Sequence, residues 1–200
     1  MKQVEINKTI HLSEHLASPS EAALGHLSEL NGSHLSPHFT LGEMTKTSTG
    51  MMNIPSRVSI ENMKRVCGWL EALRCRYNQW YVSPSSDHPA HPGTPPDSGG
   101  EKDTEEPIII SSGYRSPEVN RRVGGSATSN HLTGCAVDIR VAGIEQALRY
   151  AVILMDYADE TRQDYDELLI ERNRSGRYWV HFAVRPPKSQ NRRKTAMLSV

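Results

Sequence analysis

The alternation of apolar and polar positions along the chain predicts two long helices and four strands. Apolar residues recur at helical spacing from about Ser59 to Trp80, and again from Ile144 to Ala158. Short runs rich in β-branched and aromatic residues predict strands at 108–111, 135–140, 165–171 and 177–184. Together these elements predict an α+β fold, an antiparallel β-sheet with helices packed against it.

Composition along the chain sets the expected boundaries of this fold. We expect a flexible leader at residues 1–36, one folded domain at 37–187 and a solvated basic tail at 188–200. Residues 83–106 are rich in Pro, Gly and Ser and predict an exposed insertion within the domain. Two short helices are expected to begin at Thr40, in a capping box with Glu43, and at Ser116, followed by Pro117.

Overall charge and hydropathy argue against two classes of partner. The formal net charge is zero, so nothing favours a nucleic-acid partner. The sequence has no apolar run long enough to span a bilayer, and residues 1–5 lack the hydrophobic core of a signal peptide. We therefore expect a monomer that is synthesised in the cytoplasm and does not bind a membrane.

The stretch 129–138 carries the most chemistry in the sequence. A glycine turn at Gly134 lets His131 fold back over Asp138, which lies on the strand that follows. Strand side chains alternate, so Asp138 stands on the face opposite to Val137 and Ile139. A histidine and a carboxylate held together in this way are two of the three protein ligands of an open zinc site.

The third ligand is expected to be a histidine on a neighbouring strand. His181 lies in the strand predicted at 177–184, on the same face as Trp179 and Ala183. The residues alone also allow a plainer interpretation, in which His131 and Asp138 form a salt bridge and His181 is an unrelated half-buried histidine.

Several motifs taken together resemble the zinc D-Ala-D-Ala carboxypeptidases. They are Ser112-Gly113-Tyr114-Arg115-Ser116, then Asn120 and Val123-Gly124-Gly125, then Ser129-x-His131-x-x-Gly134-x-Ala136-x-Asp138, and finally Trp179-Val180-His181. This family includes VanY-like peptidases and phage endolysins, and its metal-site fold recurs in hedgehog domains. The resemblance covers roughly residues 37–186.

The resemblance implies a metal site and a substrate. It implies Zn²⁺ held by His131, Asp138 and His181 in a groove of the sheet, and a peptidoglycan stem peptide as substrate. The reaction would be that of a carboxypeptidase or of an L-Ala-D-Glu or cross-link endopeptidase, and the protein could be phage-derived. Arg115 matches a family arginine that faces the substrate, and a guanidinium suits a carboxylate. Ser129 is expected either to bond substrate or to hold the loop.

The catalytic base departs from the family pattern. Many relatives carry a Glu three residues before the last histidine ligand, where this chain has Tyr178. Glu171, on the preceding strand, is our candidate for the base, and Glu167 is the second choice.

A base in doubt leaves a second hypothesis open. The protein would then be a zinc-containing module that binds cell wall without cutting it, or a structural component of a virion. In either version, a protein made without a signal peptide would reach the cell wall through lysis or export.

Overall fold

The computed structural model describes residues 32–82 and 105–200. Most of the expected leader and of the expected insertion therefore lies outside the described residues. The elements, in chain order, are β1 (His34–Ser36), β2 (Phe39–Thr40), α2 (Leu41–Thr45), α3 (Arg57–Tyr77), a π-helical turn η1 (Asn78–Val82), β3 (Ile110–Ser112), α4 (Pro117–Arg122), a 3-10 turn η2 (Asn130–Thr133), β4 (Ala136–Arg140), α5 (Ile144–Thr161), β5 (Glu167–Arg172), β6 (Tyr178–Ala183) and β7 (Lys194–Ser199). None of the described helices combines the length and apolar character needed to cross a membrane.

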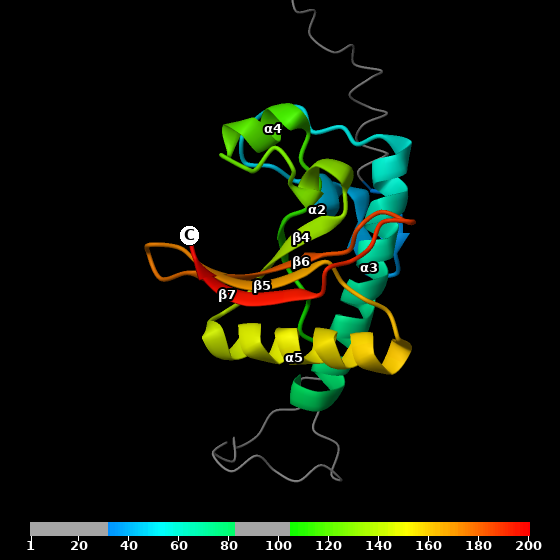
Figure 1. Cartoon of the computed structure of the whole chain (residues 1–200), viewed down its shortest axis with the longest axis vertical. Coiled ribbons are helices and arrows are strands. Elements are labelled where there is room, and N and C mark those ends of the chain that lie inside the picture. Colours follow the sequence, from blue (N-terminus) through cyan, green and yellow to red (C-terminus); the bar gives the residue numbers. More distant parts are fainter. Residues whose placement is uncertain (1–31, 83–104) are drawn as a thin grey trace, which may run out of the picture.

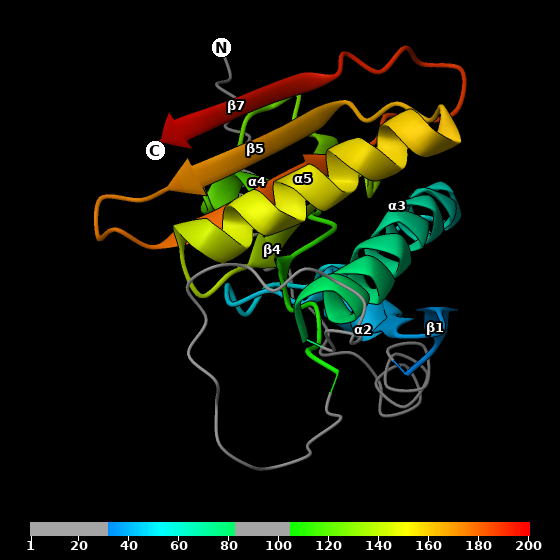
Figure 2. The ribbon, with the colours of Figure 1, turned by 90° about the horizontal axis from the view of Figure 1, so that it is seen from below.

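A five-stranded sheet forms the centre of the fold, with the strand order β3-β4-β6-β5-β7. Figures 1 and 2 show α5 lying across one face of this sheet, with α3 beside it, while α4 lies on the opposite side. The fold is α+β, as predicted. The prediction of an antiparallel sheet holds for β3, β4, β6 and β5 but is wrong for β7, which pairs with β5 in parallel.

β7 falls where the sequence predicted a solvated basic tail. Its alternating apolar residues are few and its first residues are basic, so the pattern of residues 188–200 resembles an exposed charge run. In the structure Arg192 and Lys194 pair with carboxylates next to β5, and this neutralisation accompanies the added strand. The basic side chains are exposed, and what the prediction missed is the strand that residues 194–199 form beside β5.

The two faces of the sheet differ because side chains alternate along each strand. The face toward the helices is apolar and buried, and it includes Val137, Ile139, Val180, Phe182, Leu168 and Ile170. Trp69 of α3 joins this core, with its ring 5.2 Å from that of Phe182 and 4.9 Å from that of Tyr157 on α5. The other face is left for polar side chains.

The predicted capping residues were confirmed at two short helices. At the long helix α3 the predicted first residue was wrong by two positions. Thr40 and Glu43 form the predicted capping box, and Ser116 caps α4 with Pro117 in its first turn. The helix expected from Ser59 begins at Arg57 instead, because the Ser56 side chain accepts a hydrogen bond from the Ser59 backbone N–H.

Candidate metal centre

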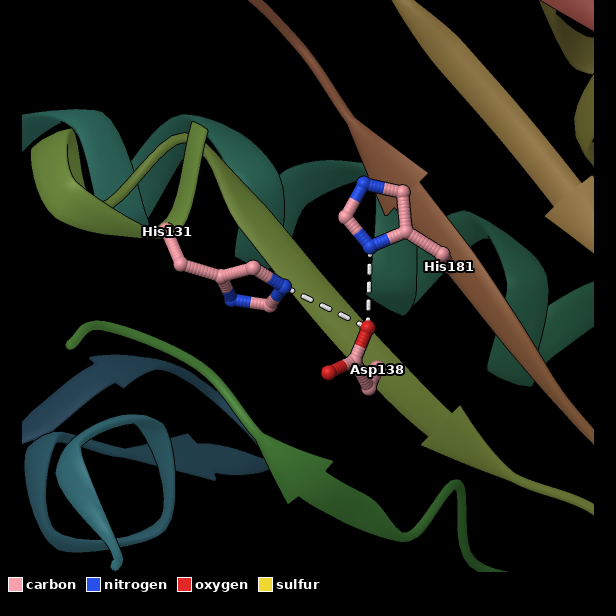
Figure 3. Close-up of side chains that lie close together, drawn as sticks. All are labelled: His131, Asp138 and His181. Carbon is pink, nitrogen blue, oxygen red and sulfur yellow. Dashed lines mark hydrogen bonds and ion pairs between the residues drawn. The ribbon is translucent and has the colours of Figure 1, made fainter. Parts of the chain in front are cut away.

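His131, Asp138 and His181 meet on the polar face of the sheet, and their candidate ligand atoms all lie within 4.8 Å of one another. Asp138 and His181 face each other directly across the β4–β6 pair. The His131 ring enters from η2, so that both imidazoles point at the Asp138 carboxylate (Figure 3). His131 Nε2 lies 3.3 Å, and His181 Nδ1 2.9 Å, from Asp138 Oδ1.

A glycine places the first histidine. Gly134 ends η2 with a φ of 71°, in the left-handed region that glycine adopts without steric cost. A Cβ there would also lie 2.5 Å from the backbone oxygen of Ser59 in α3. The turn predicted from the sequence therefore needs glycine for both its conformation and its packing, and it returns the chain into β4 with His131 above Asp138.

The His131 ring is fixed by a backbone carbonyl. Its Nδ1 donates a hydrogen bond of 2.6 Å to the Gly113 oxygen, which leaves the lone pair of Nε2 facing Asp138. Gly113 has no room for a side chain, since a Cβ would lie 2.3 Å from the Met44 oxygen. The sequence motif around Gly113 gave no sign of this contact, because a backbone acceptor carries no signature of its own.

His181 is held by two carboxylates. Nδ1 bonds Asp138, while Nε2 lies 3.7 Å from Glu167 Oε2. Burial on its own lowers the pKa of His181, but the bonds to Asp138 and Glu167 raise it to about 9. Burial likewise favours a neutral Asp138, yet the two histidines hold the pKa of Asp138 below its usual range. The centre thus attracts positive charge, as a proton or as a metal ion.

The donor set fits a zinc ion. Ligands about 2.0 Å from a tetrahedral metal lie about 3.3 Å from each other, close to the two distances measured to Asp138 Oδ1. Two imidazoles and one carboxylate form a ligand set of the catalytic type, and both rings have an acceptor on the nitrogen that faces away from Asp138.

The other residues predicted for the site line one cavity with these three. Arg115, Ser129 and Glu171 border a pocket of 360 Å³ together with His131, Asp138 and His181. The six residues that we predicted for the site from the sequence therefore line one pocket in the fold. Their individual roles do not follow from this proximity alone.

Arg115 contacts a metal-site carboxylate. Its Nη2 lies 2.5 Å from Asp138 Oδ2, and its Nε donates to Ser112 Oγ at 2.8 Å. From the family resemblance we expected Arg115 to face the substrate. The structure gives it a position from which it both orients Asp138 and borders the pocket. Ser129 similarly accepts a hydrogen bond from the His131 backbone N–H, so it holds the loop and also lines the cavity.

The two candidate bases on β5 share a face but differ in their surroundings. Glu167 contacts Arg192, Lys194 and Asn130, and its pKa falls to about 2 because of its bond to His181 and these neighbours. Glu171 lines the metal pocket, and burial raises its pKa, with Asp138 acting in the same direction against the opposing effects of His181 and Trp179.

Tyr178 lies on the wrong face to contribute a base. It is three residues before His181 in a regular strand, and an odd separation turns the side chain to the helix side of the sheet. Glu171 pairs across the sheet with Trp179, two residues from His181 and on the same face. A carboxylate on β5 can therefore reach the pocket where residue 178 cannot.

The sequence analysis did not identify the residues that hold the metal ligands in place through hydrogen bonds. Asp166 is fully buried, and it accepts hydrogen bonds from Asn130, next to His131, and from Arg192. Asp166 directly precedes Glu167, the neighbour of His181. Its only sequence signal was a charged residue at the start of an apolar strand.

Comparison with known protein families agrees with this centre. Residues 101–165 match the family model of peptidase M15. The match contains Arg115, His131 and Asp138 and stops before β5 and β6, so the positions of Glu171 and His181 rest on the structure. No curated protein matches the chain.

Proposed function

We propose that this chain, whose residues 101–165 match the peptidase M15 family model, is a zinc metallopeptidase that cleaves peptidoglycan stem peptides. The observation that carries the proposal is the convergence of His131, Asp138 and His181 in one pocket with Glu171. Ligands alone would suit a structural metal, but the half-buried Glu171 carboxylate in the same pocket adds the group that hydrolysis needs.

His131, Asp138 and His181 would hold the metal ion. When bound, zinc supplies Lewis-acid chemistry, since it polarises a carbonyl and makes water more acidic. Arg115 keeps Asp138 Oδ2 engaged, which leaves Oδ1 directed at the two imidazoles. The Gly113 carbonyl and Glu167 fix the orientation of the two rings.

Glu171 would act as the base. Its raised pKa brings the carboxylate closer to the range in which it can accept a proton from the attacking water and then deliver it to the leaving amine. Glu167 is poorly suited to this role, because its neighbours stabilise the charged form and weaken it as a proton acceptor. Arg115 borders the pocket and would hold a substrate carboxylate or carbonyl oxygen.

The metal pocket has a neighbouring cavity on each side along β6, which favours the endopeptidase version. A second cavity of 320 Å³ shares His181, Glu171 and Ser129 with the metal pocket and extends past Arg185. Toward the other end of β6, Trp179 lines both the metal pocket and a cavity of 790 Å³. A substrate can therefore continue in both directions from the centre, whereas a carboxypeptidase needs a closed end.

The test is mass spectrometry of purified peptidoglycan after incubation with the protein, with and without a zinc chelator. We expect new muropeptides that disappear with the chelator and return when zinc is added back. Masses that correspond to cleavage inside a stem peptide or cross-link would identify an endopeptidase, and loss of a single terminal residue would identify a carboxypeptidase. A zinc-loaded protein that yields no product would contradict the proposal.

A further inference from the structure

The 790 Å³ cavity at the start of β6 lies beyond the metal pocket and has no role in the chemistry described above. One wall is the chain around Ile109 and Ser111, and another is the end of the β5–β6 hairpin at Arg177. The cavity wraps around the end of the sheet, where Gln146 and Tyr150 of α5 also line it. Arg140, the last residue of β4, lies between them. The cavity has more than twice the volume of the metal pocket, so it can hold a sizeable part of a substrate.

Two of the residues that line the cavity, Arg140 and Arg177, are basic. Arg140 and Arg177 are exposed. Neither forms an ion pair with a carboxylate within residues 32–82 and 105–200. One carboxylate, Glu106, also lines the cavity, but it accepts a hydrogen bond of 2.8 Å from Gln146. Two unpaired guanidinium groups therefore remain available to a ligand with negative charge.

The cavity is placed in register with the metal centre. Arg140 follows Asp138 by two residues on the same face of β4, and it pairs across the sheet with Trp179, just as Asp138 pairs with His181. Two residues of strand span about 7 Å, which is also the length of about two residues of an extended peptide. Trp179 borders both cavities, so a bound peptide passes over an aromatic surface between them.

We propose that Arg140 and Arg177 form a subsite for a carboxylate-bearing segment of the substrate, about two residues from the bond that is cleaved. Guanidinium groups present paired N–H donors that match a carboxylate. This inference rests on the proposed peptidase function and adds a selectivity to it, namely for substrates whose acidic groups are free over those whose acidic groups are amidated.

The test uses two synthetic peptidoglycan stem peptides that differ only in carrying carboxylates or carboxamides on their acidic residues. The ratio of kcat/KM for the two peptides is measured in the wild type and in Arg140→Gln, Arg177→Gln and Arg174→Gln. Arg174 is the matched control, because it is an exposed arginine of the same hairpin that does not line the cavity. We expect a preference of about tenfold for the carboxylate peptide in the wild type and the control, and its loss through KM in Arg140→Gln and Arg177→Gln.

Two results would overturn the subsite. One is a wild-type ratio near one, and the other is an unchanged preference in both cavity variants. If the wild type cleaves neither peptide, the peptidase proposal fails separately, and tryptophan fluorescence titration then decides the subsite. Tighter binding of the carboxylate peptide that is lost in Arg140→Gln would support the subsite without the activity, while equal binding of both peptides would refute it.

Discussion

The groove along β6 has arginines at both ends, but among the described residues only those at one end form ion pairs with carboxylates. At the Arg185 end, Arg185 and Arg192 both contact the buried Asp166, and Arg192 also contacts Glu167. At the Trp179 end, Arg140 and Arg177 have no acidic partner in the described part of the chain. Ion pairs join the strands at the first end, whereas the second end carries the arginines of the proposed subsite.

The two glutamates of β5 repeat this difference on a smaller scale. Glu167 lies at the paired end, where surrounding donors lower its pKa to about 2. Glu171 lies four residues away on the same face, where burial raises its pKa. Identical side chains on one strand thus differ in pKa according to the charges and donors that surround them. Three experiments can break or sharpen this comparison.

The largest expected effect is the loss of activity when the proposed base, Glu171, is replaced. Glu171→Gln keeps the shape of the side chain but removes the proton acceptor, so we expect kcat to fall by about 10²- to 10⁴-fold. Glu167→Gln is the matched control on the same strand, and it should lower kcat far less. Steady-state cleavage assays measure both effects, with zinc content determined for each variant. Equal losses in the two variants, with zinc retained, would remove Glu171 as the base.

The next effect is on stability at the paired end. Asp166→Asn leaves Arg185 and Arg192 without their buried counter-ion, so we expect the free energy of unfolding to fall by about 3 kcal/mol. Zinc affinity should weaken as well, because Asp166 also holds Asn130 beside His131. Asp164→Asn is the control, since its pair with Arg193 lies on the surface and should contribute less than about 1 kcal/mol. Urea unfolding and zinc titration separate the two effects, and equal stability of the two variants would contradict the assignment.

Some residues of the site could be predicted from the sequence, and others depend on contacts between distant parts of the chain. His131, Asp138 and Gly134 lie within eight residues of each other, so local turn and strand rules were enough to bring them together. His181 followed from a strand pattern and the family resemblance. Glu171 was preferred to Glu167 from the family resemblance alone, and the choice stays a prediction. The two residues share strand, face and chemistry, so the physical difference between them lies in neighbours distant in sequence, which only the fold brings together.

The C-terminal residues show what local patterns miss. β7 is stabilised by ion pairs that cross from Arg192 and Lys194 to Asp166 and Glu167, about 26 residues earlier. Nothing within residues 188–200 indicates such partners, so a charge run was the reasonable prediction. The unpaired state of Arg140 and Arg177 is equally invisible in the sequence, because it depends on which carboxylates the fold leaves out of reach.

The smallest effect concerns the pH dependence of stability, where the two glutamates should act with opposite sign. The folded-state pKa of Glu167 is depressed, so its carboxylate stabilises the protein above pH 4.5, and this contribution is lost as the pH falls toward about 2. The folded-state pKa of Glu171 is raised, so its carboxylate lowers stability at neutral pH, and that cost disappears as the pH falls below 4.5.

Chemical unfolding of the metal-free protein between pH 2 and 7 tests these signs directly. At pH 7, Glu167→Gln should be less stable than the wild type by about 2 kcal/mol, while Glu171→Gln should be more stable than the wild type. Both differences should shrink toward zero at the acid end, as the pH approaches the folded-state pKa of Glu167 and lies well below that of Glu171. The contrary result is a Glu171→Gln variant that is less stable than the wild type at pH 7. It would mean that hydrogen bonds or ion pairs already stabilise the Glu171 carboxylate in the folded protein. The contrast between the two ends of the groove would then not extend to the proposed catalytic base.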